Sequence, residues 1–194
     1  MNYQRINAES HNMSESDFDF RYNIQPGRHL YQFYKGIEDY VKVVVPFLRA
    51  GLEKGEACLW LVSSQIDLDE VMAYMEEEIP RLLFYVSSGQ LTIRSAEEWY
   101  LTEGHFDEGR ALQNAIQFGN EIQKKGFHRV RMAGDAGVIP HEDWLFLKAY
   151  EEKSDQIIKA SQAIVLCCYP ILGCDLHDTK MVLECHDNVL MGRL

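Results

Sequence analysis

Two uninterrupted apolar runs constrain the fold of this chain more than any other feature. Residues 57–62 read Ala-Cys-Leu-Trp-Leu-Val, and residues 163–169 read Ala-Ile-Val-Leu-Cys-Cys-Tyr. Neither run alternates with polar residues, as a strand with one wet face would, so both indicate strands that are covered on both faces. Strands of this kind belong to parallel sheets packed between two layers of helices.

The rest of the chain alternates strand and helix signals around these runs. We expect further strands at 29–34, 91–94 and 128–133, and amphipathic helices at 37–54, 68–78, 80–86, 108–126 and 141–158. The pattern predicts an α/β three-layer sandwich with a mainly parallel sheet of at least five strands. Residues 179–190 fit either a helix or a terminal strand.

The length of the chain limits its domain organisation, and its charge limits the partners to be expected. The 194 residues fit a polar N-terminal arm over 1–27, ended by Pro26 and Gly27, and a single domain over 28–194. A formal charge of −11 disfavours nucleic acid or an anionic membrane as partner. No apolar stretch approaches the ~18 residues of a spanning helix, and no leader is evident, so we expect a cytoplasmic protein.

The expected carboxyl ends of the strands carry aromatic and small polar residues. In parallel sheets, ligands bind at this edge, and few of the residues there are charged. Asp135 follows Gly134 directly after an expected strand and projects from a tight turn, where it can either meet a ligand or cap the next element. We call the residues at this edge the rim, and their composition suits a small, partly apolar ligand. Its members are Tyr34, Lys35, Ser63, Ser64, residues 97–100, Gly134, Asp135, Tyr169 and Pro170.

Motifs of catalysis and phosphate binding are missing. Residues 34–39 read Tyr-Lys-Gly-Ile-Glu-Asp, where a phosphate loop would carry further glycines and a Lys-Ser/Thr pair. The chain also lacks a G-x-S-x-G elbow, an H-E-x-x-H helix and a G-x-G-x-x-G turn. We therefore expect neither enzyme activity nor a bound cofactor or metal.

Two groups of residues have competing interpretations. Arg131 lies among apolar neighbours in an expected strand and needs a carboxylate, for which Glu151 is the candidate in a structural ion pair. The five cysteines include no CxxC pair and fit reduced structural thiols. The alternative is a redox or metal site built on Cys167 or Cys168 with His186. Cys167 and Cys168 themselves point to opposite faces of a strand and cannot share a site.

Several short motifs together resemble a known family. They are His29-Leu-Tyr-Gln-Phe-Tyr34, Gly55-Glu-Ala-Cys-Leu-Trp60, Trp99-Tyr-Leu101 with Gly104-x-Phe-Asp107, Arg131-Met-Ala-Gly-Asp135, Tyr150-Glu151 and Leu166-Cys-Cys-Tyr169. From about residue 29 to about residue 190 the chain resembles the MEDS domain, the methanogen/methylotroph DcmR-type sensory domain. Residues 51–60 also look like a segment of KaiC-type RecA domains, so the resemblance implies a RecA/KaiC-like fold without a phosphate loop.

The resemblance implies a ligand sensor rather than an enzyme. It favours a ligand site formed by His29, Phe33, Tyr34, Trp99, Asp135 and Tyr169, although a histidine such as His29 is as readily a core residue. The implied role is sensing a small hydrocarbon derivative in prokaryotic signal transduction, including two-component systems. The output would pass through a histidine kinase, a transcriptional regulator or a homodimer. Alternatives are a non-hydrolysing nucleotide-binding module and a Cys/His-based redox or metal switch.

Overall fold

The computed structural model describes residues 23–189, so most of the predicted N-terminal arm lies outside the described residues. Its elements are β1 (Arg28–Tyr34), α2 (Ile37–Glu53), β2 (Ala57–Val62), α3 (Leu68–Glu78), α4 (Leu82–Ser87), β3 (Leu91–Ser95), α5 (Ala96–Tyr100), β4 (Leu101–Thr102), β5 (His105–Phe106), α6 (Glu108–Lys124), β6 (Val130–Asp135), the 3-10 helices η1 (Ala136–Val138) and η2 (His141–Asp143), α7 (Trp144–Ser161), β7 (Ile164–Pro170), α8 (Leu176–Cys185) and β8 (Asn188–Val189).

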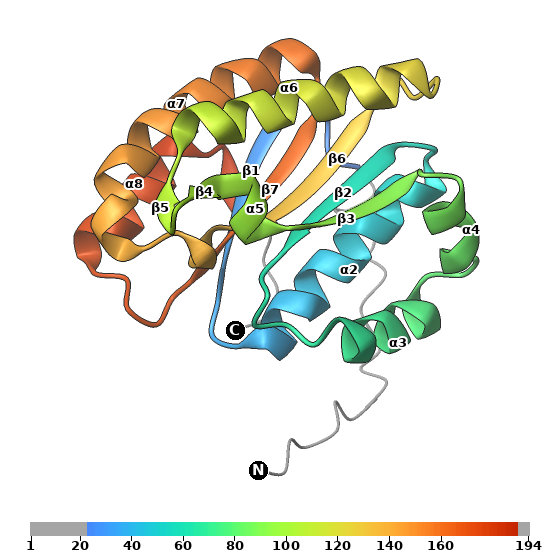
Figure 1. Ribbon diagram of the computed structural model, residues 1–194, viewed down its shortest axis with the longest axis horizontal. Coiled ribbons are helices and arrows are strands. Elements are labelled where there is room, and N and C mark those ends of the chain that lie inside the picture. Colours follow the sequence, from blue (N-terminus) through green and yellow to red (C-terminus); the bar gives the residue numbers. More distant parts are fainter. Residues whose placement is uncertain (1–22, 190–194) are drawn as a thin grey trace.

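The main sheet has the strand order β3-β2-β6-β7-β1-β8, and every neighbouring pair is parallel (Figure 1). The predicted α/β fold with a five-stranded parallel core is therefore confirmed. The chain after residue 176 forms both of the elements considered for it. Helix α8 comes first, and the short strand β8 then pairs with β1 at the edge of the sheet.

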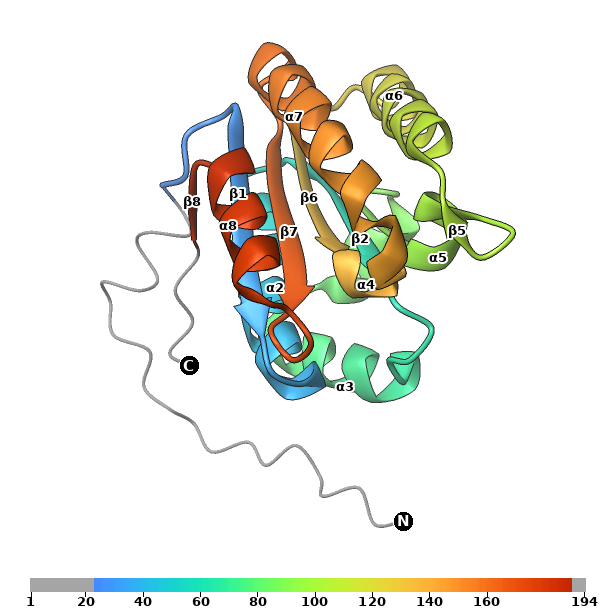
Figure 2. The same ribbon diagram turned by 90° about the vertical axis from the view of Figure 1, so that its left-hand side faces the viewer.

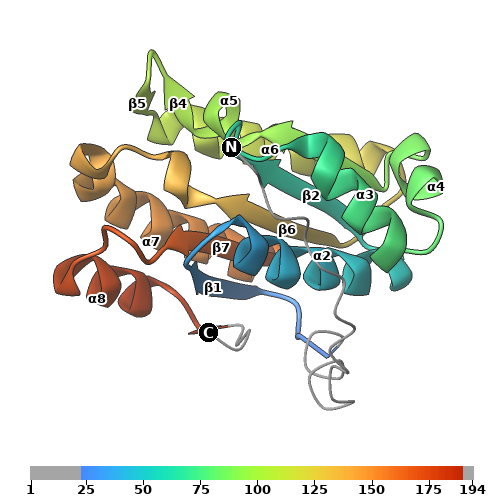
Figure 3. The ribbon, with the colours of Figure 1, turned by 90° about the horizontal axis from the view of Figure 1, so that it is seen from below.

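Two layers of helices enclose the sheet. Helices α2, α3 and α4 cover one face, and α5 to α8 cover the other (Figures 1 and 3). The pleat of β1 sends Leu30 into the first core and Tyr31 into the second, as strand geometry requires. All six residues of β2 are buried, which explains its uninterrupted apolar sequence. Among residues 23–189, no helix is both long and apolar enough to cross a membrane.

Aspartate side chains cap the N-termini of three α-helices. Asp107 accepts a hydrogen bond from the Arg110 amide and starts α6 as predicted, and Asp67 does the same for α3 through two amides. Asp175 forms a reciprocal capping box with Asp178 at the start of α8. Each cap satisfies backbone N–H groups that the first helical turn leaves without partners.

The segment from residue 99 to 107 is a packed loop rather than a free lid. It forms α5 and then the small β4-β5 hairpin. The Phe106 amide donates to the Asp143 carboxylate at 2.8 Å, and the Phe106 ring lies edge-on to Tyr150 with centroids 5.4 Å apart. The hairpin is thereby held to α7, the helix that covers the middle of the sheet.

Candidate functional site

Tyr34 and Asp135 meet at the carboxyl ends of β1 and β6. The Tyr34 hydroxyl donates a hydrogen bond to Asp135 Oδ1 at 2.8 Å, and the Gly137 amide donates to the same oxygen at 2.9 Å. Burial raises the pKa of Asp135, and the two hydrogen bonds offset part of that rise. Asp135 thus caps η1 and is covered by its own loop, which is the structural role considered for it above.

Gly137 closes over this pair. A Cβ atom at position 137 would lie 2.7 Å from Tyr34 Oη, 2.9 Å from Asp135 Oδ1 and 3.1 Å from Pro170 Cδ. These distances are well inside van der Waals contact, so only glycine allows the loop after β6 to lie this close to β1 and β7.

An open cavity of about 290 Å³ lies directly above, between the loops that follow β6 and β7. Its walls combine apolar side chains with a substantial share of polar surface, and His141 and Cys174 are among the lining residues. The lining residues are Gly137, Val138, Ile139, Pro140, His141, Trp144, Pro170, Leu172, Gly173 and Cys174. This volume and lining suit a small, partly apolar organic molecule.

Contacts between separate elements hold the cavity walls in place. The His141 imidazole lies 2.8 Å from Asp178 and so joins η2 to α8, and the Trp144 indole N–H donates to the Ile139 carbonyl at 3.2 Å. The Asp178 carboxylate raises the pKa of His141 through this hydrogen bond and the opposite charge, which favours the ion pair.

A second cavity of about 420 Å³ lies at the end of β3, against α5 and α6. Trp99 lines it together with Arg94 and Arg110. Both guanidinium groups are engaged, because Arg94 donates to Glu121 at 2.8 Å and Arg110 donates to the Glu98 carbonyl at 2.9 Å. The structure therefore places Trp99 away from Tyr34 and Asp135.

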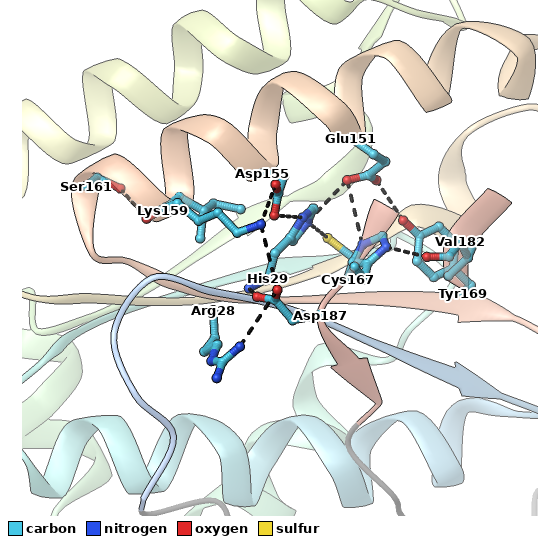
Figure 4. Close-up of polar contacts among 12 residues, drawn as sticks. Arg28, His29, Glu151, Asp155, Lys159, Ser161, Cys167, Tyr169, Val182 and Asp187 are labelled. Atoms are coloured by element: carbon cyan, nitrogen blue, oxygen red, sulfur yellow. Dashed lines mark hydrogen bonds and ion pairs between the residues drawn. The ribbon is translucent and has the colours of Figure 1, made fainter. Parts of the chain in front are cut away.

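His29 and Tyr169 lie in neither cavity. They belong to a polar cluster buried between the sheet and α7 (Figure 4). The Tyr169 hydroxyl donates to Glu151 Oε1 at 2.7 Å, while His29 Nε2 lies 3.3 Å from Glu151 Oε2. Phe33 stands between the two regions, with its ring centroid 6.1 Å from that of Tyr169. The predicted ligand set is thus divided among separate places in the fold.

The same buried cluster contains Cys167 and His186. Cys167 Sγ lies 3.5 Å from His29 Nε2, and His186 Nε2 lies 3.8 Å from Glu151 Oε2. Cys168 is buried in the core on the opposite face of the sheet, so the two cysteines do not share a site, as strand geometry predicted. Burial raises the pKa of both thiols well above the usual value.

The predicted ion pair between Arg131 and Glu151 is wrong. Arg131 Nε donates to Glu56 Oε2 at 2.7 Å, and its Nη1 donates to the Phe47 carbonyl at 3.2 Å. Arg131 points to the α2 side of the sheet, where its guanidinium carbon stands 4.9 Å from the Phe47 ring centroid. Glu151 lies on the α7 side, so the sheet separates the two residues.

Glu97, which belongs to the predicted group of residues at the carboxyl edge, joins two loops there. Its Oε1 accepts hydrogen bonds from the Ser64 amide at 2.8 Å and the Ser64 hydroxyl at 2.7 Å, and its Oε2 accepts one from Ser95. Burial alone would raise the pKa of Glu97, but these hydrogen bonds outweigh it and the pKa is lowered. The structure thus brings together Ser64 and Glu97, which were predicted to lie at the same edge of the sheet.

These features define an α/β domain with a small, loop-built cavity at the carboxyl edge of a parallel sheet. The model of the family described as MEDS, the methanogen/methylotroph DcmR sensory domain, matches residues 28–187. The chain belongs to this family of sensory domains, and the resemblance noted from its motifs is confirmed. No curated protein matches the sequence.

Proposed function

We propose that this chain is a non-catalytic sensory domain that binds a small, partly apolar organic molecule in the cavity above Tyr34 and Asp135. The observation that carries the proposal is the cavity of about 290 Å³, with walls that are partly apolar and partly polar, set where ligands bind in parallel α/β sheets. Membership of a sensory family supports it. The hydrocarbon derivatives that the family resemblance implies fit a cavity of this size and polarity.

The buried thiols support a non-catalytic role. A cysteine acts as a nucleophile through its thiolate, and burial raises the pKa of Cys167 and Cys168 well above the usual value. Asp135, which would be the acidic residue of a nucleotide hydrolase, is occupied in capping η1.

Transmission of the bound state requires a partner or a second copy of the chain. Large apolar side chains flank the cavity on its outer side, with Leu145 82%, Leu172 75% and Leu176 86% exposed. They come from α7, the loop after β7 and α8. The first two line the cavity, and α8 contacts its wall through Asp178 and His141. An exposed apolar surface of this kind favours contact with another protein, such as a kinase, a regulator or a homodimer partner.

Ligand binding can be tested through Trp144, which lines the cavity. We would follow intrinsic fluorescence and thermal unfolding while adding short-chain alcohols, methylamines or halomethanes. A ligand that binds only the folded state raises stability by about 2.7 kcal/mol at roughly a hundredfold excess over its Kd. Val138→Phe fills the cavity and is expected to abolish both signals, whereas Trp144→Phe is expected to remove the fluorescence change alone.

The control is Asn114→Phe, which adds a ring at the wall of the second cavity, where the Asn114 side chain donates to the Trp99 carbonyl at 3.0 Å. It is expected to keep the response to organic ligands. If Val138→Phe and Asn114→Phe respond alike, or if no organic compound shifts the wild-type protein, the proposed site is wrong.

A nucleotide-binding function has one specific observation in its favour. The second cavity brings Arg94 and Arg110 together, and guanidinium groups suit the phosphates of a nucleotide. The same screen tests this alternative. A thermal shift with nucleotides that Asn114→Phe removes and Val138→Phe keeps would favour it over an organic ligand.

A further inference from the structure

Four ligand-type side chains converge in the buried cluster between the sheet and α7. They are His29 from β1, Glu151 from α7, Cys167 from β7 and His186 from the segment that follows α8. One donor atom from each lies within 4.8 Å of all the others. The His29 and His186 side chains are fully buried, and that of Glu151 is 2% exposed. The cluster is therefore not a chance grouping of solvated side chains at the surface.

The spacing of the donor atoms fits a tetrahedral metal ion. Bonds of about 2.0–2.3 Å from a central ion give tetrahedron edges of about 3.3–3.8 Å. His29 Nε2 lies 3.3 Å from Glu151 Oε2 and 3.5 Å from Cys167 Sγ, and His186 Nε2 lies 3.8 Å from Glu151 Oε2. These three edges have the lengths that a common centre requires.

The orientation of His186 indicates that a cation belongs between the donors. His186 Nδ1 lies 2.8 Å from the Val182 carbonyl oxygen, which only accepts, so Nδ1 carries the proton. In the neutral imidazole, Nε2 then presents a lone pair, and it lies 3.8 Å from Glu151 Oε2. That lone pair faces the Glu151 carboxylate, and two acceptors facing each other in a buried site repel unless a cation lies between them.

The hydrogen bonding of the cluster is incomplete on its inner side. Within residues 23–189, Glu151 Oε2 and His186 Nε2 are buried and make no hydrogen bond. Their outer atoms are well held, because Glu151 Oε1 accepts from Tyr169 and His186 Nδ1 donates to Val182. Buried polar atoms normally have partners. Among the described residues, four atoms of the cluster lack one: Glu151 Oε2 and His186 Nε2 face the four donors, and His29 Nδ1 and Asp155 Oδ1 lie 3.8 Å apart behind the His29 ring.

Outer contacts complete the pattern of a metal site. His29 Nδ1 faces Asp155 Oδ1 at 3.8 Å, and Asp155 is held in turn by Lys159 at 2.7 Å (Figure 4). A carboxylate behind a metal-binding histidine, with hydrogen bonds behind the other ligands, is the usual support of such sites.

We propose that His29, Glu151, Cys167 and His186 form a closed tetrahedral site for a divalent metal ion of the zinc type. The ion binds the Cys167 thiolate, the Glu151 carboxylate and two neutral imidazoles, and the thiol proton is released to solvent. Two anionic ligands balance the charge of the ion, so the buried site is neutral overall. The mixture of nitrogen, oxygen and sulfur donors favours Zn²⁺ over Mg²⁺ or Ca²⁺.

The test uses Co²⁺, which occupies zinc sites and reports their geometry by absorption. The full chain is unfolded in denaturant together with a chelator, and the chelator is then removed. One sample is refolded with Co²⁺ and compared with a sample refolded without metal. We expect one Co²⁺ per chain, intense visible bands of tetrahedral cobalt and a near-ultraviolet thiolate-to-cobalt band. Zn²⁺ is expected to displace the cobalt and to raise the unfolding temperature.

The neighbouring cysteines provide a matched pair of variants. Cys167→Ala is expected to lose the thiolate-to-cobalt band, and Cys168→Ala, whose side chain lies across the sheet, is expected to keep it. His186→Gln retains a polar side chain and is expected to weaken Co²⁺ binding by more than about tenfold.

Circular dichroism decides whether each variant is folded. If Cys167→Ala does not fold, the wild-type spectrum and His186→Gln still decide the question. Absence of tetrahedral cobalt bands in the refolded wild type would overturn the proposal, as would equal loss of the thiolate band in both cysteine variants. The site lies apart from the proposed ligand cavity, so its failure leaves the sensory proposal standing.

Discussion

Removing the charge of Arg131 is expected to be among the most damaging single changes outside the apolar core. The Arg131 side chain is fully buried, that of Glu56 is 2% exposed, and Arg131 Nε lies 2.7 Å from Glu56 Oε2. Arg131→Met keeps much of the length of the side chain but leaves the Glu56 carboxylate without its counter-charge. Breaking a buried pair in this way costs about 3–5 kcal/mol of folding free energy.

That loss is large compared with the stability of a domain. Single domains unfold with about 5–15 kcal/mol, and for a chain of this size each kcal/mol moves the melting temperature by roughly 2–4 °C. We therefore expect Arg131→Met to lower the melting temperature by roughly 6–20 °C. Urea unfolding, followed by far-ultraviolet circular dichroism, measures the free energy directly.

The control is an ion pair with a similar distance between nitrogen and oxygen that is exposed to solvent. Lys42 Nζ lies 2.6 Å from Glu38 Oε1, and both side chains are more than half exposed. Lys42→Met is expected to cost less than about 1 kcal/mol. The double variant with Arg131→Met and Glu56→Met is expected to recover much of the loss, because no buried charge remains. A cost for Arg131→Met as small as that for Lys42→Met would refute the reasoning.

Three further predictions concern the carboxyl edge of the sheet. Gly137→Ala forces a methyl group against the Tyr34 hydroxyl and is expected to cost about 1–3 kcal/mol in urea unfolding, together with a loss of ligand response. Tyr34→Phe removes a hydrogen bond from the buried Asp135 carboxylate and is expected to cost about 1–3 kcal/mol without removing the fold, as circular dichroism would establish. Glu97 has a folded-state pKa below its usual value of 4.5, so its hydrogen bonds to Ser64 stabilise the fold above that pH and the stabilisation is lost as pH falls. The stability difference between wild type and Glu97→Gln is therefore expected to shrink between pH 6 and roughly pH 3, and a constant difference would contradict the assignment.

Much of the architecture could be predicted from local pattern. The apolar runs of β2 and β7 and the helix expected from residue 108 each depend on neighbouring residues only, and each has its expected structure. The hairpin from β4 to β5 was not expected as such, because two-residue strands leave no periodic signal.

The partner of Arg131 was missed because a sequence pattern does not say which face of a sheet a helix covers. Alternation along β6 groups Arg131 with Ala133, and both face α2. Glu56 directly precedes β2, which pairs with β6, so it was the nearer carboxylate once that pairing is known. Glu151 instead belongs to the helix on the other side.

The buried cluster was only partly foreseen, for a related reason. His186 and Cys167 were considered together, but His29 was assigned to the ligand site and Glu151 to Arg131. Joining the four requires knowing that β1 lies beside β7 and that the chain after α8 returns to β1. Neither pairing follows from spacing along the sequence.

Helix α8 is fastened at each end to a different site. The helix lies beside β1 and β7 (Figure 2). At its start, Asp178 holds His141 of the cavity wall at 2.8 Å, and directly after its end His186 enters the buried cluster. The sheet beneath is hydrogen-bonded along β1, β7 and β6, so it resists local displacement. Helix α8 therefore connects the wall of the cavity, at His141, with the buried cluster, at His186. A displacement of η2 would be opposed at both ends of this helix.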